Sequence, residues 1–568
     1  MDIENKLQEF KEVFLPEGFI WRRGQKEAII QIIETYLEGK TKAVILDAPV
    51  GSGKSIISMA VSWILNQKGK KGYILASDVA LQEQYEKDFE KFGLKWGTIK
   101  GLDHYDCIDN MEKHALGTCK IRGIDARKMS CYSECPYYSA REKASVSPTS
   151  LMNYAYWMVM QNYVNQILDN PHFPPRDFTI CDEGHKILDI VQGSYSPKLG
   201  PFVLEKIEKL TEFFETYHVD DLTINFIKIK NIIEDIVNEE DQDKLLQLLK
   251  DILYHIKPYL ASATTLKKRV KEDYPHDEPP KAWRKAIRNC DGITDLYAKI
   301  YDYVEVIEAT SNRNLVKNPQ MKGEIVFNCL EENYLMHKYF HKWTGFTVIM
   351  SATFSNPKEY LKDIAIRNAK YIKLESTFDF SKSPIYYYNQ RKMGYKDIAA
   401  NLPWLYTTID NLIKNHKGEN GIIHTASYKL TMDIYQNLSR ESRQRVLIYE
   451  GTQEKRNVLE ELKISNDKIL MGPSLLEGID LKHNWSRFQI VAKIPYLSLG
   501  DRFVKAKLSI NPAWYSYHAA LSLEQGIGRS IRSEDDWAIT YILDASFSDL
   551  LRKNLISSEI YKRIRVIK

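Results

Sequence analysis

The first hundred residues alternate short apolar runs with longer stretches of helical periodicity. Residues 43–46 form an apolar run that ends at Asp47, and a Gly-rich segment then leads into a helical pattern over 55–65. A second apolar run, 73–76, is followed by a helical pattern over 81–89. Short apolar strands that alternate with amphipathic helices are typical of a parallel sheet covered by helices. The pattern therefore predicts an α/β fold.

Two long segments interrupt this alternation. Residues 101–142 show little periodicity, whereas residues 195–338 are dominated by helical periodicity, with leucine and isoleucine at intervals of three and four in 243–260. Strand-like runs separated by helices resume after residue 380. We therefore predict two parallel-sheet α/β domains, with a cysteine-rich insertion and an all-helical insertion in the first. The predicted boundaries are 1–100, 143–194 and 339–378 for the first domain, 101–142 and 195–338 for its two insertions, and 379–568 for the second domain.

The composition is that of an ordered globular protein. Of the 568 residues, 44% are hydrophobic and 27% are charged, which excludes a wholly disordered chain. No apolar run approaches the roughly 18 residues of a membrane-spanning helix, and the charged N-terminus lacks the apolar core of a signal peptide. We expect a soluble, cytoplasmic protein that does not bind membranes.

The net charge of +4 produces no overall basic field, so any nucleic-acid surface has to be local. In residues 266–288, eight Lys/Arg residues face four Asp/Glu residues. This segment is a candidate surface for nucleic acid, but taken alone it is better explained as a solvated helical face.

Residues 48–55 read APVGSGKS, the pattern of a P-loop between a predicted strand and a predicted helix. Lys54 would reach the β- and γ-phosphates of a nucleotide, and the Ser55 hydroxyl would bind Mg²⁺. Backbone N–H groups at the start of the helix would surround the phosphate oxygens. These N–H groups belong to Gly51, Ser52 and Gly53.

An acidic pair supplies the other half of a magnesium–nucleotide site. Asp182 and Glu183 follow the strand-like run 178–181 and begin the sequence DEGH. Asp182 would hold Mg²⁺ through water, and Glu183 would polarise the attacking water. An acidic pair at a strand end is weak evidence alone, but together with an upstream P-loop it indicates nucleotide hydrolysis.

A motif near the C-terminus could place cations for the same reaction. Residues 525–532 read QGIGRSIR, with Arg529 and Arg532 three positions apart. Guanidinium groups brought across a domain cleft to the γ-phosphate stabilise the charge of the transition state. The alternative is a surface arginine pair beside a glycine kink, which the other motifs disfavour. We expect Gln525 and both arginines to act in catalysis opposite Lys54.

Four of the seven cysteines fall within 29 residues at the spacing C-x11-C-x11-C-x3-C, and they are Cys107, Cys119, Cys131 and Cys135. Four thiolates can hold a [4Fe–4S] cluster or a structural Zn²⁺. Zinc sites usually offer two close pairs of ligands, and this segment offers one. The residues alone leave the two metals nearly equal, with unrelated thiols as a third interpretation.

Together the motifs resemble those of the iron–sulfur DNA helicases of the XPD/DinG group of superfamily 2, over about residues 20 to 550. The P-loop, DEGH and QGIGRSIR match helicase motifs I, II and VI in order. Gln25 in WRRGQ is similar to the upstream glutamine motif, SAT at 351–353 to motif III, and EGID at 477–480 to motif V. CPYY at 135–138 is similar to the sequence around the last cluster cysteine of that group.

The resemblance implies two RecA-like domains that bind ATP and Mg²⁺ between them, with Gln25, Gly478 and Asp480 among the nucleotide-binding residues. It favours a [4Fe–4S] cluster over zinc in the cysteine-rich insertion, and it implies that the helical insertion forms an arch around one DNA strand. The implied activity is ATP-dependent 5′→3′ unwinding by a monomer that acts on single-stranded DNA and on forked or tailed duplexes, with the strands separating near the cluster. The alternatives are a translocase or remodeller that does not separate strands, an RNA-directed helicase, and a nucleic-acid-binding module with an inactive ATPase site.

Overall fold

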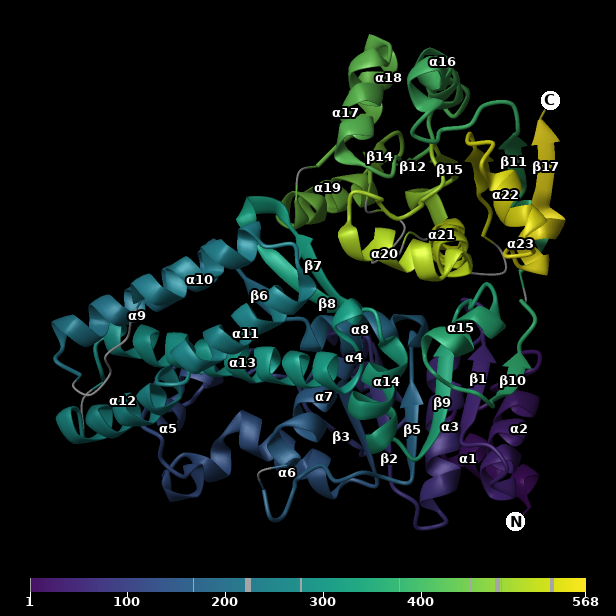
Figure 1. Cartoon of the computed structure of the whole chain (residues 1–568). Helices are drawn as coiled ribbons and strands as arrows, with labels where there is room; N and C mark the ends of the chain where they lie inside the picture. The colour runs from purple at the N-terminus through teal and green to yellow at the C-terminus, as the bar shows by residue number, and fades with distance from the viewer. Residues whose placement is uncertain are drawn as a thin grey trace.

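The computed structural model contains two seven-stranded parallel β-sheets, the first in the lower half and the second in the upper half of Figure 1. It describes residues 2–567 except 167, 220–225, 276–277, 377, 450, 474, 476–480, 482 and 532–535. The predicted α/β fold with two parallel-sheet domains is confirmed.

The first sheet places three functional loops side by side. Its central strands β1, β9 and β5 are neighbours, with Asp47 paired to Ser351 and Cys181 to Ile349. Because parallel strands end at the same edge, the loops that follow these strands meet there. The strand order is β10 (Lys370–Lys373), β1 (Ala43–Asp47), β9 (Phe346–Ser351), β5 (Phe178–Cys181), β2 (Gly72–Ala76), β4 (Thr149–Asn153) and β3 (Gly97–Thr98).

Helices cover both faces of this sheet, which explains why its central strands β1, β9, β5 and β2 are buried along their whole length. One apolar core packs the sheet against α1 (Ile3–Phe14), α2 (Gln25–Glu38), α3 (Lys54–Asn66) and α4 (Val79–Lys91). The core on the other face includes residues of α7 (Tyr154–Asn162), α8 (Ile187–Tyr195), α14 (Glu332–Tyr339) and α15 (Pro357–Asp363).

The cysteine-rich segment between β3 and β4 consists of short turns of helix. Its longer elements are α5 (Thr118–Ile121) and α6 (Pro136–Val146). Pro136 opens α6 at the first helical position, where a missing N–H group costs no hydrogen bond.

The segment between α8 and α14 is mostly helical, but the prediction of an all-helical insertion is wrong. A three-stranded antiparallel sheet forms its base, in the order β6 (Lys198–Leu199), β8 (Ile325–Cys329) and β7 (Leu315–Pro319). Residues 325–329 alternate between buried and half-buried positions, which is the period of a strand and not of a helix. The helices are α9 (Pro201–Thr216), α10 (Phe226–Asn238), α11 (Gln242–Ile256), α12 (Tyr259–Asp273) and α13 (Lys281–Ala309).

The far ends of α12 and α13 contact the cysteine-rich segment (Figure 1). Arg284 Nη1 lies 3.1 Å from Glu112 Oε1, and Arg122 Nη1 donates a 3.0 Å hydrogen bond to the carbonyl of Pro275. Part of the basic segment 266–288 is therefore engaged in contacts within the chain. No helix in the described part of the chain is long and apolar enough to cross a membrane.

The second domain repeats the parallel-sheet arrangement. Its strand order is β13 (Val446–Leu447), β14 (Ile469–Gly472), β12 (Gly421–His424), β15 (Phe488–Val491), β16 (Ile539–Ile542), β11 (Ile385–Tyr388) and β17 (Ile564–Ile567). Its helices are α16 (Ile398–Asn415), α17 (Tyr428–Asn437), α18 (Arg440–Arg445), α19 (Thr452–Ile464), α20 (Arg502–Ile510), α21 (Pro512–Ile527), α22 (Phe547–Arg552) and α23 (Ser558–Arg563).

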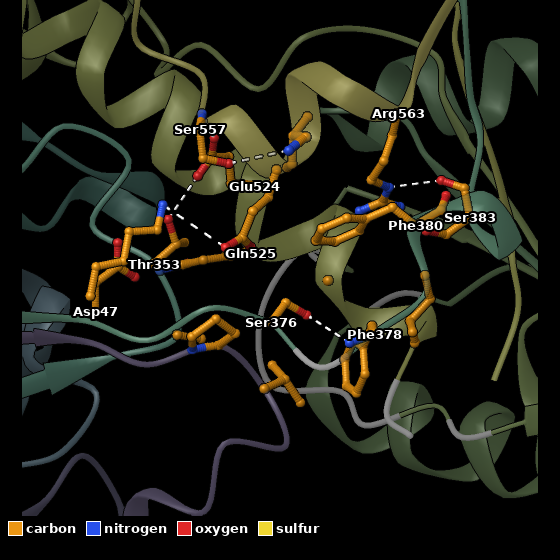
Figure 2. Close-up of a pocket in the computed structure, with 18 residues that line it drawn as sticks. Asp47, Thr353, Ser376, Phe378, Phe380, Ser383, Glu524, Gln525, Ser557 and Arg563 are labelled. Atoms are coloured by element: carbon orange, nitrogen blue, oxygen red, sulfur yellow. Dashed lines mark hydrogen bonds and ion pairs between the residues drawn. The ribbon is translucent and has the colours of Figure 1, made fainter. Parts of the chain in front are cut away.

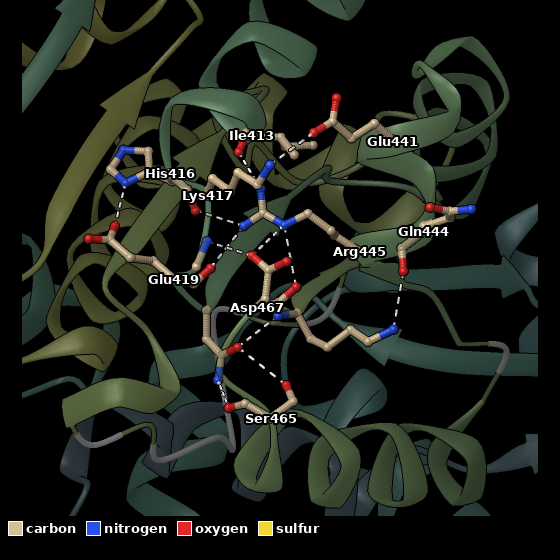
Figure 3. A network of polar contacts seen from close by, with 12 residues as sticks. Ile413, His416, Lys417, Glu419, Glu441, Gln444, Arg445, Ser465 and Asp467 are labelled. Carbon is tan, nitrogen blue, oxygen red and sulfur yellow. Dashed lines mark hydrogen bonds and ion pairs between the residues drawn. The ribbon is translucent and has the colours of Figure 1, made fainter.

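A buried guanidinium group holds the end of α16 in this domain (Figure 3). Arg445 donates hydrogen bonds to the carbonyls of Ile413, His416 and Glu419, and its Nε lies 2.8 Å from Asp467 Oδ1. The last carbonyls of a helix have no partner within the helix and carry partial negative charge. Arg445 therefore satisfies several backbone groups at once and ties α16 to the segment before β14.

The base of the helical insertion also touches the second domain, at α20. The side chains of Glu332 and Lys507 form a buried ion pair. Asn318 Nδ2 donates a 2.9 Å hydrogen bond to Asp501 Oδ2, and Asn318 Oδ1 accepts one from the backbone N–H of Arg502. In Figure 1 this junction lies on the opposite side of the domain interface from the segment that connects β10 to β11.

Candidate active site between the two domains

The P-loop connects the end of β1 to the start of α3. Gly51 and Gly53 adopt positive φ angles of 83° and 78°, which glycine tolerates without strain. A Cβ atom on Gly53 would lie 2.4 Å from Gln25 Nε2. Gln25 is fully buried and donates a 3.1 Å hydrogen bond to the carbonyl of Ser52. Gln25 thus supports the backbone that the sequence predicts to surround phosphate.

The acidic pair lies directly opposite the P-loop lysine. Asp182 follows β5 and is buried, with Oδ2 accepting a 2.9 Å hydrogen bond from the Tyr85 hydroxyl and Oδ1 accepting one from the Glu183 N–H. Lys54 Nζ lies 3.9 Å from Glu183 Oε1. A Cβ on Gly184 would lie 2.1 Å from Ile349, so this turn packs tightly against β9.

The two carboxyl groups have pKa values shifted in opposite directions. Burial raises the pKa of Asp182, and the charge of Glu183 raises it further against the opposing effect of Lys54. For Glu183, burial also favours the neutral acid, but the positive charges of Lys54, Lys186 and Arg529 outweigh it and hold the pKa below its usual value. Glu183 is therefore ionised at neutral pH and able to accept a proton.

The site includes a residue of the second domain, because the positive charge of Arg529 contributes to the lowered pKa of Glu183. Arg529 lies just after α21, in a single helical turn. Burial lowers the pKa of His185 in the DEGH segment, and the charge of Arg529 adds to this effect. Gln525, on α21, lines a cavity at the domain interface together with Pro49 at the start of the P-loop (Figure 2). Arg532, Gly478 and Asp480 lie outside the described residues.

The SAT segment makes a direct contact across the interface. Ser351 Oγ lies 2.8 Å from His185 Nδ1, and Thr353 Oγ1 donates a 2.7 Å hydrogen bond to Glu524 Oε2 of α21. Glu524 also accepts from the backbone N–H of Ser557. The sequence offered no signal for Glu524 or for Tyr85, because only the fold brings them to the site.

The four predicted metal-ligating cysteines line one small pocket, together with His114 and Tyr138; they are Cys107, Cys119, Cys131 and Cys135. Among the described residues, no group of three or more His, Cys, Asp or Glu side chains is arranged to hold a single metal ion. A [4Fe–4S] cluster binds each thiolate to a different iron atom, so its ligands stand further apart than those of one ion. The four thiol groups that line this pocket are the donor set of either a [4Fe–4S] cluster or a structural Zn²⁺.

The surroundings of this pocket are apolar and aromatic. His114 is buried, its Nδ1 lies 3.9 Å from Cys135 Sγ, and its ring stacks on Tyr137. The Tyr138 hydroxyl lies 3.9 Å from Cys119 Sγ. Burial raises the pKa of Cys119, so its thiol is neutral at neutral pH in the absence of a bound cation.

Both halves of the site lie in segments that match known protein families. Residues 18–223 match the family described as type III restriction enzyme, res subunit, and residues 409–563 match the helicase C-terminal domain family. The chain is 20% identical to the ATP-dependent DNA helicase YoaA of Escherichia coli (strain K12), over 93% of this chain and 92% of that protein. The chain is thus similar to helicases of the XPD/DinG-like group of superfamily 2.

Solved structures of XPD proteins have the same fold as this chain. The structure of S. tokodaii Xpd4 matches with a TM-score of 0.61 and 15% identity, covering 96% of this chain and 100% of that one. A structure titled XPD helicase matches with a TM-score of 0.64 and 16% identity, covering 96% and 99%. The two parallel-sheet domains are therefore RecA-like, as predicted.

Proposed function

We propose that this protein is an ATP-dependent helicase that moves 5′→3′ along single-stranded DNA and separates forked or tailed duplexes. The observation that carries the proposal is the meeting of Lys54, Glu183 and Arg529 from opposite domains at one interface. An enzyme whose site is completed by two domains can convert hydrolysis into relative motion of those domains. The full alignment with a DNA helicase of similar length supports DNA as the substrate.

The geometry of the site supports a chemical role for each residue. The backbone of residues 51–53 and Lys54 would bind the β- and γ-phosphates, and Arg529 would stabilise the charge that develops during transfer. Glu183, which is ionised at neutral pH, would take the proton of the attacking water. Ser55 and Asp182 would hold Mg²⁺, which neutralises phosphate charge.

The two insertions would guide the DNA. The contact between Arg284 and Glu112 joins the helical insertion to the cysteine-rich segment, which supports the role of the former as an arch. The four cysteines would hold a [4Fe–4S] cluster that fixes the fold of a segment with little regular structure. We expect the strands to separate near this segment, and we expect the protein to act as a cytoplasmic monomer.

Strand displacement with directional substrates tests the proposal. Duplexes with a 5′ tail, a 3′ tail or no tail are mixed with protein and ATP, and release of a labelled strand is followed. We expect release from the 5′-tailed duplex alone. ATP hydrolysis stimulated by DNA without strand release would indicate a translocase, and stronger stimulation by an RNA tail of equal sequence would indicate an RNA-directed enzyme.

A further inference from the structure

The cavity at the domain interface continues beyond the phosphate-binding residues. Pro49 and Val50, at the start of the P-loop, form one wall, and Gly528 and Ile531, next to Arg529, form another. The volume is about 110 Å³, several times the roughly 10–15 Å³ that one buried water needs. A small group attached to a phosphate chain in the P-loop can therefore enter it.

Two aromatic side chains form the side of the cavity that faces the connection between the domains. Phe378 and Phe380 lie in the segment between β10 and β11, and both are only half-buried (Figure 2). A flat aromatic ligand stacks on such rings at little conformational cost, since each phenyl group has few rotatable bonds. The chemistry of this wall suits a heteroaromatic ring.

A buried cation at the end of α23 reaches the same cavity with a free donor. Arg563 is 7% exposed, and its Nε donates a 2.7 Å hydrogen bond to the carbonyl of Ser383. Its Nη2 is buried and has no hydrogen-bond partner among the described residues. Burial lowers the pKa of Arg563 to about 10, so the group stays charged at neutral pH. A buried charged donor without a partner is costly, which points to a ligand that supplies an acceptor.

Carboxyl groups that could accept hydrogen bonds from a ligand lie in the same cavity, although none is bonded to Arg563 Nη2 among the described residues. The carboxyl groups of Glu524 and Glu559 line the cavity near Arg563, and Lys373 Nζ lies 3.9 Å from Glu559 Oε1. A purine base presents an acceptor beside a donor along its polar edge, for example a ring nitrogen beside an amino group. An arginine next to a carboxyl group complements that edge.

We propose that this cavity binds the purine base of the nucleoside triphosphate, with Phe378 and Phe380 stacking on the ring and Arg563 donating to its polar edge. The proposal rests on the proposed ATPase function and extends it to residues that the sequence motifs do not include. It makes the connecting segment and α23 part of the nucleotide site, so base recognition would require both domains.

Binding of ADP and of inorganic tripolyphosphate, measured by calorimetry, tests the assignment. We expect Arg563→Met to weaken ADP binding about tenfold or more, as loss of a charged hydrogen bond does, while tripolyphosphate, which has no base, binds as before. The exposed Arg565→Met is the matched control and should change neither affinity. Equal weakening of both ligands by Arg563→Met, or of neither, would overturn the base site.

A second measurement on the unaltered protein keeps the test independent of folding. Photolabelling with 8-azido-ATP followed by peptide mapping should mark residues 378–383 or 558–563. Labelling confined to residues 18–31, around Gln25, would overturn the proposal while leaving the ATPase intact. If the unaltered protein binds neither ADP nor tripolyphosphate, the proposed ATPase function fails together with this inference.

Discussion

Thr353 in the first domain donates a 2.7 Å hydrogen bond to Glu524 in the second. Because Glu524 also accepts from the backbone of Ser557, one carboxyl group connects the SAT segment, α21 and the start of α23. The neighbouring residue on α21 is Gln525, and Arg529 follows one turn later. Glu524 thus links the SAT segment of the first domain to the part of α21 that holds the proposed catalytic residues.

Burial raises the pKa of Glu524 to about 7, so the folded protein holds this proton more tightly than the unfolded chain does. The contribution of Glu524 to the free energy of unfolding is therefore complete below about pH 4.5 and is lost as the pH rises toward 7. Glu524→Gln keeps the side chain neutral and should stabilise the protein at pH 8 by on the order of 1–3 kcal/mol, with a much smaller effect at pH 5. Thermal unfolding at both pH values measures this, with the exposed Glu27→Gln as control. An equal change in the stability of Glu524→Gln at pH 5 and at pH 8 would contradict this prediction.

Removing the P-loop lysine should abolish hydrolysis without unfolding the domain. Lys54 makes a 3.9 Å contact to Glu183 and is otherwise available for phosphate. We expect Lys54→Ala to lower DNA-stimulated ATP turnover by at least ~100-fold, as loss of one charge-stabilising donor does. Circular dichroism should be unchanged. Retained turnover would refute the assignment of the P-loop.

Tyr85 should control magnesium binding through Asp182. Its hydroxyl lies 2.9 Å from Asp182 Oδ2, and loss of such an outer contact typically weakens metal binding by about 10- to 100-fold. We therefore expect Tyr85→Phe to raise the Mg²⁺ concentration for half-maximal ATPase activity by about tenfold, with little change at saturating Mg²⁺. Tyr73→Phe, which loses a hydrogen bond to Pro174 away from the site, is the control. If Tyr85→Phe does not change the Mg²⁺ dependence, Tyr85 contributes only to packing and not to Mg²⁺ binding.

The cysteine pocket should contain iron. Anaerobically prepared protein is expected to hold about four irons per chain with a broad visible absorption band. Cys135→Ser should lose most of the iron, whereas Cys329→Ser, which alters a cysteine outside the pocket, should retain it. Stoichiometric zinc without iron would instead favour a structural zinc site. If Cys135→Ser does not change the metal content, both the iron–sulfur and the zinc interpretation of this pocket are wrong.

Arg445 should be important for the stability of the second domain and irrelevant to catalysis. Its guanidinium group bonds the carbonyls of Ile413, His416 and Glu419 (Figure 3). Arg445→Met leaves these carbonyls without partners and should destabilise the domain by about 2–4 kcal/mol. The exposed Arg440→Met, on the same helix, should have little effect. Urea unfolding, monitored by limited proteolysis of the second domain, measures the difference in stability between the two variants.

The sequence predicts the parts of this protein that depend on local patterns. Residues 43–46 read AVIL and residues 178–181 read FTIC, so their predominantly apolar, β-favouring composition predicts buried strands of a parallel sheet. Residues 370–373, which read KYIK, form an edge strand that is mostly exposed, and no apolar run marks it. The small sheet at the base of the helical insertion was hidden by the strong helical periodicity on either side.

Contacts between distant segments could not be predicted in this way. Tyr85 and Asp182 are 97 positions apart, and Thr353 and Glu524 are 171 apart. Each pair depends on how strands and helices pack, and none of the four residue types is unusual for its local element. The P-loop and DEGH were recognisable because phosphate binding requires fixed residues at fixed spacing, whereas supporting residues need only reach the site.

The junction at α20 restricts how the two halves of the molecule can move. The covalent connection ties them at one side, and the buried ion pair of Glu332 and Lys507 ties them at the other. A body fastened at both ends of a seam turns about the line between the fastenings more readily than it slides along it. Each cycle of nucleotide turnover would then rotate the second domain about the line that joins the two connections, and the base of the helical insertion would lie at one end of this hinge axis.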